Sequence, residues 1–401
     1  MVVQHNMQAA NANRMLNVTT GQQAKSTEKL SSGYRINRAA DDAAGLTISE
    51  KMRKQIRGLD RASTNAEDGV SAVQTAEGAL TEVHSMLQRM NELATQAANG
   101  TNSDTDRSAI QDEIEQLTTE IDRVSETTKF NETYLLKGEN GTSKKNIDLQ
   151  AHDAGLKGSL TTGSDGTATF TMDKLKSGDT VSIGGKSYTI GTSADADNDG
   201  VDDNDKSVIT AERAYTLAAN ELLKANQIGD TNSQAKVGID DNYTAMTLDN
   251  ATNVIKLHVG SAAVANTLSF SLHVGSDADM TNKINVNIDA MDSSSLGIKG
   301  INVNDDTGIA GTYAIDAISD AISKVSSQRS ALGAVQNRLE HTIDNLDNVV
   351  ENTTTAESRI RDTDMAEEMV NYSKNNILAQ AGQSMLAQAN QSNQGVLSLL
   401  Q

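Results

Sequence analysis

The sequence predicts an α+β protein: a long, coiled-coil-like helical rod built from both ends of the chain, with a β-rich insertion in the middle. Two apolar seams, one toward each end, predict the helices because their members recur at steps of three and four. The 401 residues contain no proline, whereas average usage of about 5% would give roughly 20. Long uninterrupted helices exclude proline, which removes a backbone donor and clashes with the preceding turn.

The first seam runs from Met52 to Leu93, and a shorter one runs from Ile110 to Val124 after the helix-breaking segment AANGTNSD at 97–104. The second long seam runs from Ile315 to Ile360. Each long seam covers about 45 residues, or roughly 70 Å of helix. Helices of this length cannot be buried alone, so we expect the two to pack on each other.

Between about 138 and 300 the composition shifts to Gly, Thr, Ser, Asp and Asn, which predicts the β-rich insertion. The segment TVSIGGKSYTIG at 180–191 predicts a β-hairpin with Val181 and Ile183 opposite Tyr188 and Ile190 across a glycine turn.

Two further patterns lie in the insertion. The word LHVGS occurs at 257–261 and again at 272–276, which suggests two similar strands. One helix is expected at 210–226, because its apolar residues form a stripe. The stripe consists of Ala214, Leu217, Ala218, Leu222 and Leu223.

The two chain ends are nearly free of charge. Residues 375–401 carry no charged side chain and residues 1–23 carry only Arg14, yet both show helical periodicity. A charge near a symmetry axis repels its own copies, so an uncharged polar face suits the axis of an assembly. A disordered Gln-rich tail is the alternative. The residues expected to make core assembly contacts are Leu378, Ala381, Met385, Ala389, Val396 and Leu399.

The composition also limits the partners and cofactors. A net charge of −20 argues against a nucleic-acid partner, because phosphate contacts need a basic face. The first residues lack a basic segment followed by an apolar one, and no run reaches the ~18 apolar residues of a membrane span. With no cysteine there is no thiolate metal site, and we expect no cofactor.

Adjacent acids at Asp41 and Asp42 do not predict a catalytic pair, because neighbouring side chains on a helix point about 100° apart. The segment GGKS at 184–187 lacks the first glycine of a phosphate-binding loop, since Thr180 stands there. None of the six histidines belongs to an H-E-x-x-H motif. We therefore expect no enzyme.

An acidic stretch at 195–206 partly matches a calcium-binding loop. Its twelfth position is Lys206 where such a loop needs a bidentate glutamate. A weak calcium site is thus weighed against an ordinary hydrated acidic loop. The candidate ligands are Asp195, Asp197, Asp199 and Asp203.

Four segments carry a family resemblance. LSSGYRINRAADDAAGLTISEKM at 30–52 resembles the N-terminal signature of bacterial flagellin, and ILAQAGQSMLAQANQSNQGVLSLLQ at 377–401 resembles its C-terminal signature. QRMNELATQAANGTNS at 88–103 and IQDEIEQLTTEIDRVSETTKFN at 110–131 are similar to flagellin as well. The resemblance covers roughly residues 1–150 and 268–401. Ser392 and Asn393 stand where many relatives have a proline, which should alter the local turn and leave the helix intact.

The resemblance implies a structural subunit that self-assembles into the flagellar filament for motility. It implies export in the unfolded state by the flagellar type III apparatus, a secreted, extracellular location, and an export chaperone and the filament cap as partners. The absence of proline would suit rapid refolding after export, because no slow X-Pro isomerisation is needed. The expected organisation is an N-terminal core helix at 1–42, rod segments at 43–150 and 268–357, a variable outer domain at 151–267, and a C-terminal core helix at 358–401.

The resemblance also assigns roles to individual residues. Asp41 and Asp42 fall in the family's connector between core and rod, where we expect helix capping or intersubunit contacts with Arg35 or Arg38.

Positions similar to the host toll-like receptor 5 site of flagellins are Arg89, Leu93 and Glu113. Alternatively, Leu93 faces the seam and Arg89 pairs with Glu92 or Glu113. The alternative functions are a hook–filament junction protein and a secreted adhesin or calcium-binding module.

Overall fold

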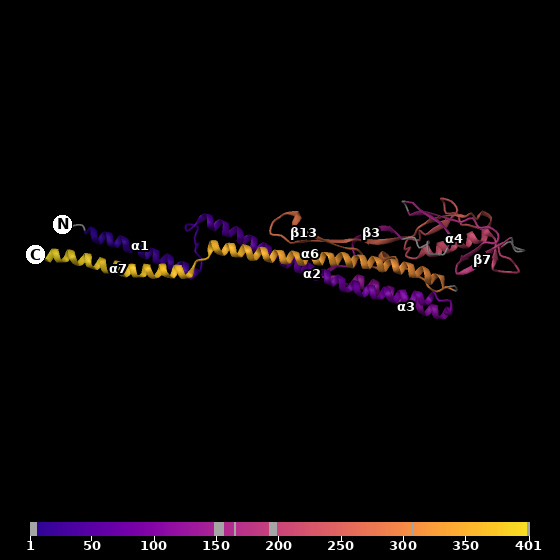
Figure 1. Cartoon of the computed structure of the whole chain (residues 1–401), viewed down its shortest axis with the longest axis horizontal. Coiled ribbons are helices and arrows are strands. Elements are labelled where there is room, and N and C mark those ends of the chain that lie inside the picture. Colours follow the sequence, from indigo (N-terminus) through magenta and orange to yellow (C-terminus); the bar gives the residue numbers. More distant parts are fainter. Residues whose placement is uncertain (1–5, 148–155, 164–165, 192–198, 306–307, 399–401) are drawn as a thin grey trace. The chain divides into compact units, whose positions relative to one another are not determined.

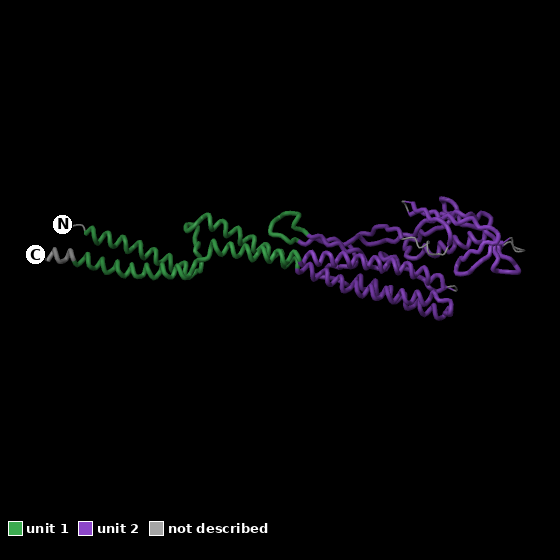
Figure 2. Tube along the Cα trace, in the orientation of Figure 1, with its two compact units in different colours: residues 1–66, 273–283, 341–401 green, residues 67–272, 284–340 purple. Residues whose placement is uncertain are grey.

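The structure is a computed structural model of the chain that divides it into two compact units (Figures 1 and 2). Unit 1 contains residues 1–66, 273–283 and 341–401, and unit 2 contains residues 67–272 and 284–340. Long helices at both ends with a β-rich region between them confirm the predicted α+β class. The described residues are 6–147, 156–163, 166–191, 199–305 and 308–398.

In unit 1, helix α1 (Met7–Ser32) packs antiparallel to helix α7 (Met365–Ser398). The Asn6 side chain begins α1 by accepting a hydrogen bond from the Ala9 amide at 3.0 Å, and its Nδ2 donates to the carbonyl of Ala389 at 3.1 Å. At the other end of the pair, Lys29 Nζ lies 3.8 Å from the Glu368 carboxylate. Among the described residues, the segments near both ends of the chain are therefore helical, as their periodicity predicts.

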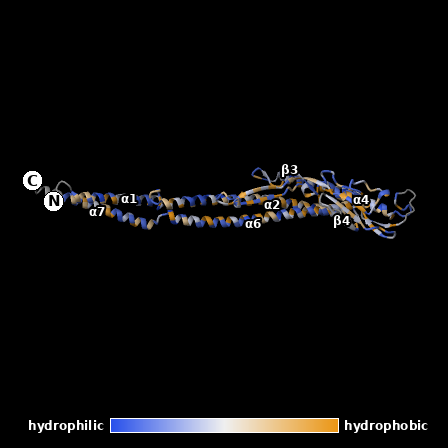
Figure 3. Ribbon diagram, turned by 90° about the horizontal axis from the view of Figure 1, so that it is seen from above, coloured by the Kyte–Doolittle hydropathy of each residue, from blue (hydrophilic) through white to orange (hydrophobic). Residues whose placement is uncertain are grey.

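Unit 1 also contains the beginning of α2 (Ala43–Ala97) and the end of α6 (Ile309–Arg361). Its small core joins Leu59 and Ala62 of α2 to Leu346 of α6. Hydrophobic and hydrophilic residues are interspersed along both helices (Figure 3). The apolar steps of three and four place the buried residues on one side of each helix.

In unit 2, the main core is formed by the rest of α2 and α6 together with α3 (Asp104–Thr127). Helix α3 begins with a capping box, in which Ser103 accepts from the Asp106 amide and Asp106 accepts from the Ser103 amide. The turn before it is the segment predicted to break the helix. Residues with no or almost no exposure include Leu80, Leu87, Ile114, Ile121 and Leu332.

Three pairs of strands and a short helix come from the part of the chain between α3 and α6 (Figure 1). The pairs are β1 (Lys129–Phe130) with β2 (Thr133–Tyr134), β3 (Glu139–Asn146) with β11 (Ser261–Asn266), and β12 (Leu268–His273) with β13 (Lys283–Ile288). The short helix is α5 (Ser293–Leu296), and a 3-10 turn at Met280–Asn282 precedes β13.

A second core in unit 2 unites two sheets and the predicted central helix, α4 (Ala211–Gln227). One sheet has the order β4-β5-β10-β9 and the other the order β6-β7-β8. The strands of the first are β4 (Gly158–Thr162), β5 (Thr167–Met172), β10 (Val254–His258) and β9 (Lys236–Gly238). Those of the second are β6 (Thr180–Ile183), β7 (Lys186–Ile190) and β8 (Val208–Ile209), and a 3-10 turn lies at Leu248–Asn250.

The predicted hairpin is present, but its register differs in part from the prediction. Val181 pairs with Tyr188 as expected, whereas Ile183 pairs with Lys186 and not with an apolar partner. Gly184 and Gly185 form a two-residue turn with φ values of 61° and 64°. Such a turn places the two residues that flank it opposite each other.

Both copies of LHVGS begin at the end of a strand, but the strands lie in different sheets. β10 is an inner strand of the four-stranded sheet, and β12 belongs to a two-stranded sheet. The repeat therefore marks two strands without making them structurally equivalent.

Candidate functional site

The α1/α7 groove is an apolar depression between the two terminal helices of unit 1, with a volume of about 650 Å³. It brings together four of the predicted assembly residues: Leu378, Ala381, Met385 and Ala389. The side chain of Val396 and the whole of Leu399 lie outside the described residues. Helix α1 contributes the apolar Ala12, Met15 and Leu16 and the polar Gln8, Asn11 and Thr19 to the lining.

Most of the surface of α1 and α7 is open in the isolated chain. Ser26 is the buried residue of α1, and among the described side chains of α7 only Ala379 is buried. Met385 is 64% exposed and Ile377 is 67% exposed. Two helices cover each other on one face only, and exposed apolar surface of this kind marks a site of association.

The connector consists of residues 33–42 and 361–364 in unit 1, where two chain segments run side by side. The Arg35 amide donates to the Arg361 carbonyl at 2.6 Å, and the Thr363 amide donates to the Gly33 carbonyl at 3.0 Å. The Arg35 guanidinium donates to the Ile360 carbonyl at 2.6 Å. Backbone pairing thus ties the end of α1 to the end of α6.

An ion pair links the connector to α2. Arg361 Nη1 lies 2.9 Å from Glu50 Oε1, and the Arg361 guanidinium carbon lies 4.8 Å from the centre of the Tyr34 ring. The ring face attracts the cation, so both contacts hold the same guanidinium.

Asp41 and Asp42 stabilise the backbone of the connector. Asp42 Oδ1 accepts from the Gly45 amide at 2.9 Å, which is the geometry of a residue that caps α2. Asp41 Oδ2 accepts from the amides of Arg38 and Asn37 at 2.9 and 3.2 Å. The Arg38 side chain binds Glu28 at 2.9 Å, so neither predicted arginine contacts the two acids through its side chain within the chain.

The turn held by Asp41 should weaken in acid. The hydrogen bond from the Arg38 amide lowers the pKa of Asp41 below 3.8, and the Asn37 amide and the positive charges of Lys25 and Lys29 act in the same direction. A depressed folded-state pKa gives stability that is present above the unfolded-state pKa and is lost as pH falls through the folded value. The difference in unfolding free energy between wild type and Asp41→Asn, measured in parallel urea titrations, should therefore shrink toward zero on acidification below pH about 4. A pH-independent difference would contradict this account.

Sequence reasoning missed a buried arginine in unit 2. Arg107 is 2% exposed and lies in the first turn of α3. Its guanidinium donates to three carbonyl oxygens: Ala97 at 3.1 Å, Asn99 at 3.3 Å and Asp305 at 2.8 Å. We call this arrangement the Arg107 joint; it ties the α2–α3 turn to the segment before α6.

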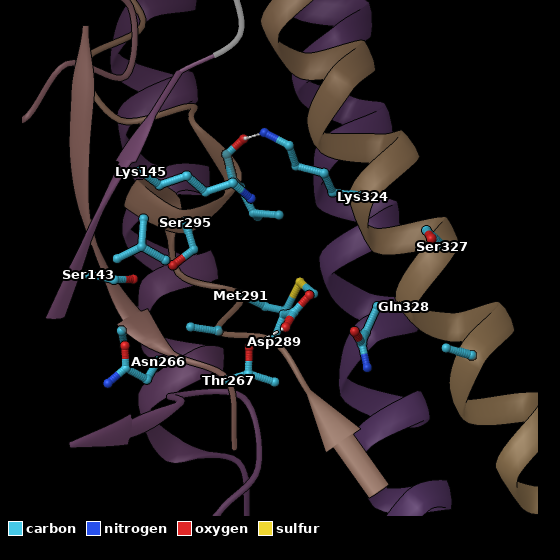
Figure 4. Close-up of a pocket in the computed structure, with 15 residues that line it drawn as sticks. Ser143, Lys145, Asn266, Thr267, Asp289, Met291, Ser295, Lys324, Ser327 and Gln328 are labelled. Carbon is cyan, nitrogen blue, oxygen red and sulfur yellow. Dashed lines mark hydrogen bonds between the residues drawn. The ribbon is translucent and has the colours of Figure 1, made fainter. Parts of the chain in front are cut away.

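The polar pocket of Figure 4 lies in unit 2 and has a volume of about 530 Å³. Lys145 and Lys324 extend from different elements toward its upper part, and Lys324 Nζ donates to the Leu296 carbonyl at 3.5 Å. The carboxylate in its lining, Asp289, accepts from Thr267 Oγ1 at 2.7 Å. No histidine lines it among the described residues.

Two of the three predicted receptor-site residues form an exposed ion pair on unit 2. Arg89 Nε lies 2.9 Å from Glu113 Oε1, and its Nη1 lies 3.2 Å from Glu92 Oε2. The carboxylate of Glu113 raises the pKa of the Arg89 guanidinium, and Glu92 adds to the effect. The structure does not place Leu93 with them on the surface. It is 2% exposed in the helical core, because it belongs to the apolar seam.

The structure describes the acidic stretch at 195–206 from residue 199 onward. Asp195 and Asp197 lie outside the described residues, and Asp199 Oδ1 accepts from the Val201 amide at 2.8 Å. Within the described part of the chain, no three acidic or histidine side chains are arranged to hold a metal ion, and no helix there is long and apolar enough to cross a membrane.

Comparison with known proteins identifies the family. Residues 3–141 match the bacterial flagellin N-terminal helical region, and residues 315–400 match the bacterial flagellin C-terminal helical region. Flagellin of Clostridium tyrobutyricum is 44% identical over 406 residues, covering 98% of this chain and 100% of the relative. Flagellin of Bacillus subtilis is 39% identical over 402 residues, covering all of both chains.

Polar flagellin A of Vibrio parahaemolyticus is 38% identical over 405 residues and 99% of each chain. The crystal structure of Bacillus cereus flagellin aligns with 71% of this chain and 88% of that chain at 18% identity, with a TM-score of 0.33. Matches at both ends and full-length relatives agree with the helical ends described above. The chain belongs to the bacterial flagellin family of structural, non-enzymatic proteins, and is a subunit of the flagellar filament.

Proposed function

We propose that this flagellin polymerises through the α1/α7 groove, and that the resulting filament serves motility outside the cell. The observation that carries the proposal is the exposed apolar surface of α1 and α7, with Met385 64% and Met15 60% exposed. Copies of the same chain are the occupant that best fits this surface. Its neutral Gln and Asn residues allow identical helices to approach without charge repulsion.

The contact must be made between different faces of successive subunits. Such a contact generates an open helical polymer when the rotation does not close into a ring. Packing of identical chains is then the whole mechanism, and no chemical step is required.

Met385→Glu should abolish polymerisation, because a carboxylate would be buried among copies of itself. The measurement is sedimentation and negative-stain microscopy of the purified full chain. Met280→Glu is the matched control, since Met280 is 76% exposed and lies outside α1 and α7. Filaments of normal yield from Met385→Glu, or equal loss from both variants, would contradict the proposed surface.

Within this proposal, residues 1–42 and 358–401 are the core helices, residues 43–150 and 268–357 form the rod, and residues 151–267 form the outer domain. The start of α2 at Ala43 and the end of α6 at Arg361 support the boundaries near the connector. Asp41, Asp42, Arg35 and Arg38 then shape the connector, and Arg38 is exposed enough to contact a neighbouring subunit as well.

Export in the unfolded state by the flagellar type III apparatus is part of the same proposal, with an export chaperone and the filament cap as partners. The absence of proline supports it, because refolding after export meets no slow X-Pro isomerisation. A hook–filament junction role is less well supported, since the relatives described above are flagellins. The described part of the acidic stretch gives a calcium-binding role no support.

We further propose that the released subunit is a ligand of host toll-like receptor 5 through the exposed Arg89–Glu113 pair. Leu93 would support this pair from the core. Arg89→Ala should weaken receptor binding by about tenfold or more if the arginine is a central anchor. Arg123→Ala, which removes another exposed ion pair on α3, is the control. Binding measured by surface plasmon resonance that is equal for both variants would count against the pair.

A further inference from the structure

The turn between α2 and α3 contains an asparagine followed by glycine, Asn99–Gly100. Both residues are exposed. A Cβ placed on Gly100 would meet no atom within 4 Å, so the space beside the Gly100 Cα is open. The Thr101 amide donates to Asn99 Oδ1 at 3.3 Å, and the Gly100 nitrogen is one of the atoms in the ring that this hydrogen bond closes. The Asn99 side chain is therefore turned toward the peptide that follows it in the chain.

We propose that Asn99 is a site of spontaneous deamidation in this protein. The Gly100 backbone nitrogen loses its proton and attacks Asn99 Cγ, a C–N bond forms, and ammonia leaves with that proton, which gives a five-membered succinimide. Water then opens the ring at one of its two carbonyls and yields aspartate or isoaspartate. No oxidant, metal or enzyme takes part. The reaction depends on the geometry of this turn and is independent of filament assembly.

A nearby asparagine provides an internal comparison. The Asn102 side-chain amide donates to the Gln96 carbonyl, so a hydrogen bond to a preceding residue holds it in place. Intramolecular attack depends on proximity and orientation, so the described geometry favours Asn99 over Asn102.

The modification would change the Arg107 joint. In the isoaspartyl product the main chain runs through the former side chain, and the original α-carbonyl of residue 99 becomes a free carboxylate. That carbonyl accepts from Arg107 Nη2 at 3.3 Å. The buried guanidinium would thus exchange a neutral acceptor for an anionic one, and charge-assisted hydrogen bonds are the stronger kind.

The test is to incubate the purified, folded full chain in mildly alkaline buffer and to follow each asparagine by peptide mass spectrometry. Isoaspartate is quantified by its methylation with protein isoaspartyl methyltransferase. We expect Asn99 to convert about tenfold faster than Asn102, because its nitrogen neighbour is unhindered and in reach. Gly100→Ala should slow Asn99 by about tenfold, since the added methyl hinders the attacking nitrogen while the open space around it leaves the fold unchanged.

A second arm uses the urea-unfolded chain, in which the turn is absent. The proposal requires Asn99 to convert in the folded chain at a rate within about tenfold of its rate in the unfolded chain. The reason is that the turn should leave the side-chain amide accessible to the Gly100 nitrogen and should not protect it. The proposal is overturned if Asn99 reacts no faster than Asn102, if Gly100→Ala has no effect, or if folding slows the reaction of Asn99 by more than about tenfold.

Discussion

Replacing Arg107 with methionine is expected to lower the free energy of unfolding of unit 2 by about 3 kcal/mol. The carbonyls of Ala97 and Asp305 would lose their hydrogen bonds from the guanidinium, whereas the Asn99 carbonyl would keep the Asn102 amide as a donor. A buried acceptor left unpaired costs more than an ordinary hydrogen bond contributes. The measurement is urea unfolding followed by circular dichroism. Hydrogen exchange at the start of α3 would show where protection is lost.

Arg123→Ala provides the matched control, because Arg123 lies on the same helix with a 59% exposed side chain and pairs with Glu120 one turn away. An exposed pair of this kind contributes about 0.5 kcal/mol or less. If the two substitutions cost the same, burial of the Arg107 guanidinium would not be the source of its effect.

Gly311→Ala is expected to destabilise the chain by about 2 kcal/mol, although alanine is the better helix former. A Cβ at this position in the first turn of α6 would lie 2.7 Å from the Ala98 nitrogen and 3.0 Å from the Ala94 carbonyl oxygen. Both are backbone atoms near the end of α2, so neither can move away by a change of side-chain rotamer. The two helices would have to separate where they now touch.

The same substitution elsewhere in α6 should have the opposite sign. A Cβ on Gly333 would meet nothing within 4 Å, so Gly333→Ala should raise the unfolding free energy by up to about 1 kcal/mol through helix propensity. Thermal and urea unfolding of the two variants, compared with wild type below the concentration at which filaments form, checks both signs. Shifts in one direction for both would show that backbone contact does not decide the outcome at Gly311.

The helices could be located from the sequence because helical periodicity is a local property. The seam from Met52 to Leu93 lies within α2, and the apolar stripe at 210–226 lies on α4. The hairpin at 180–191 was also recognisable from its two glycines. Its register was predicted only in part, because the two-residue turn at Gly184 and Gly185 pairs Ile183 with Lys186.

The candidate site was accessible to sequence reasoning to different degrees. Leu378 and Met385 share a helical face, and the structure places both in the α1/α7 groove. Two sequence-based arguments gave different expectations for the exposure of Leu93. Family resemblance suggested a receptor contact, while membership of the seam indicated burial, and the side chain is buried.

The sequence by itself determined where the helices lie, which of their faces are apolar, and that both ends lack charge, because each of these properties depends on residues a few positions apart. Only the tertiary structure decided that Arg107 is buried and that Gly311 must have no side chain. Arg107 contacts a carbonyl 198 positions away at Asp305, and Gly311 abuts the backbone of α2. Contacts between distant segments arise from how the helices pack, and no local pattern of residue types encodes them.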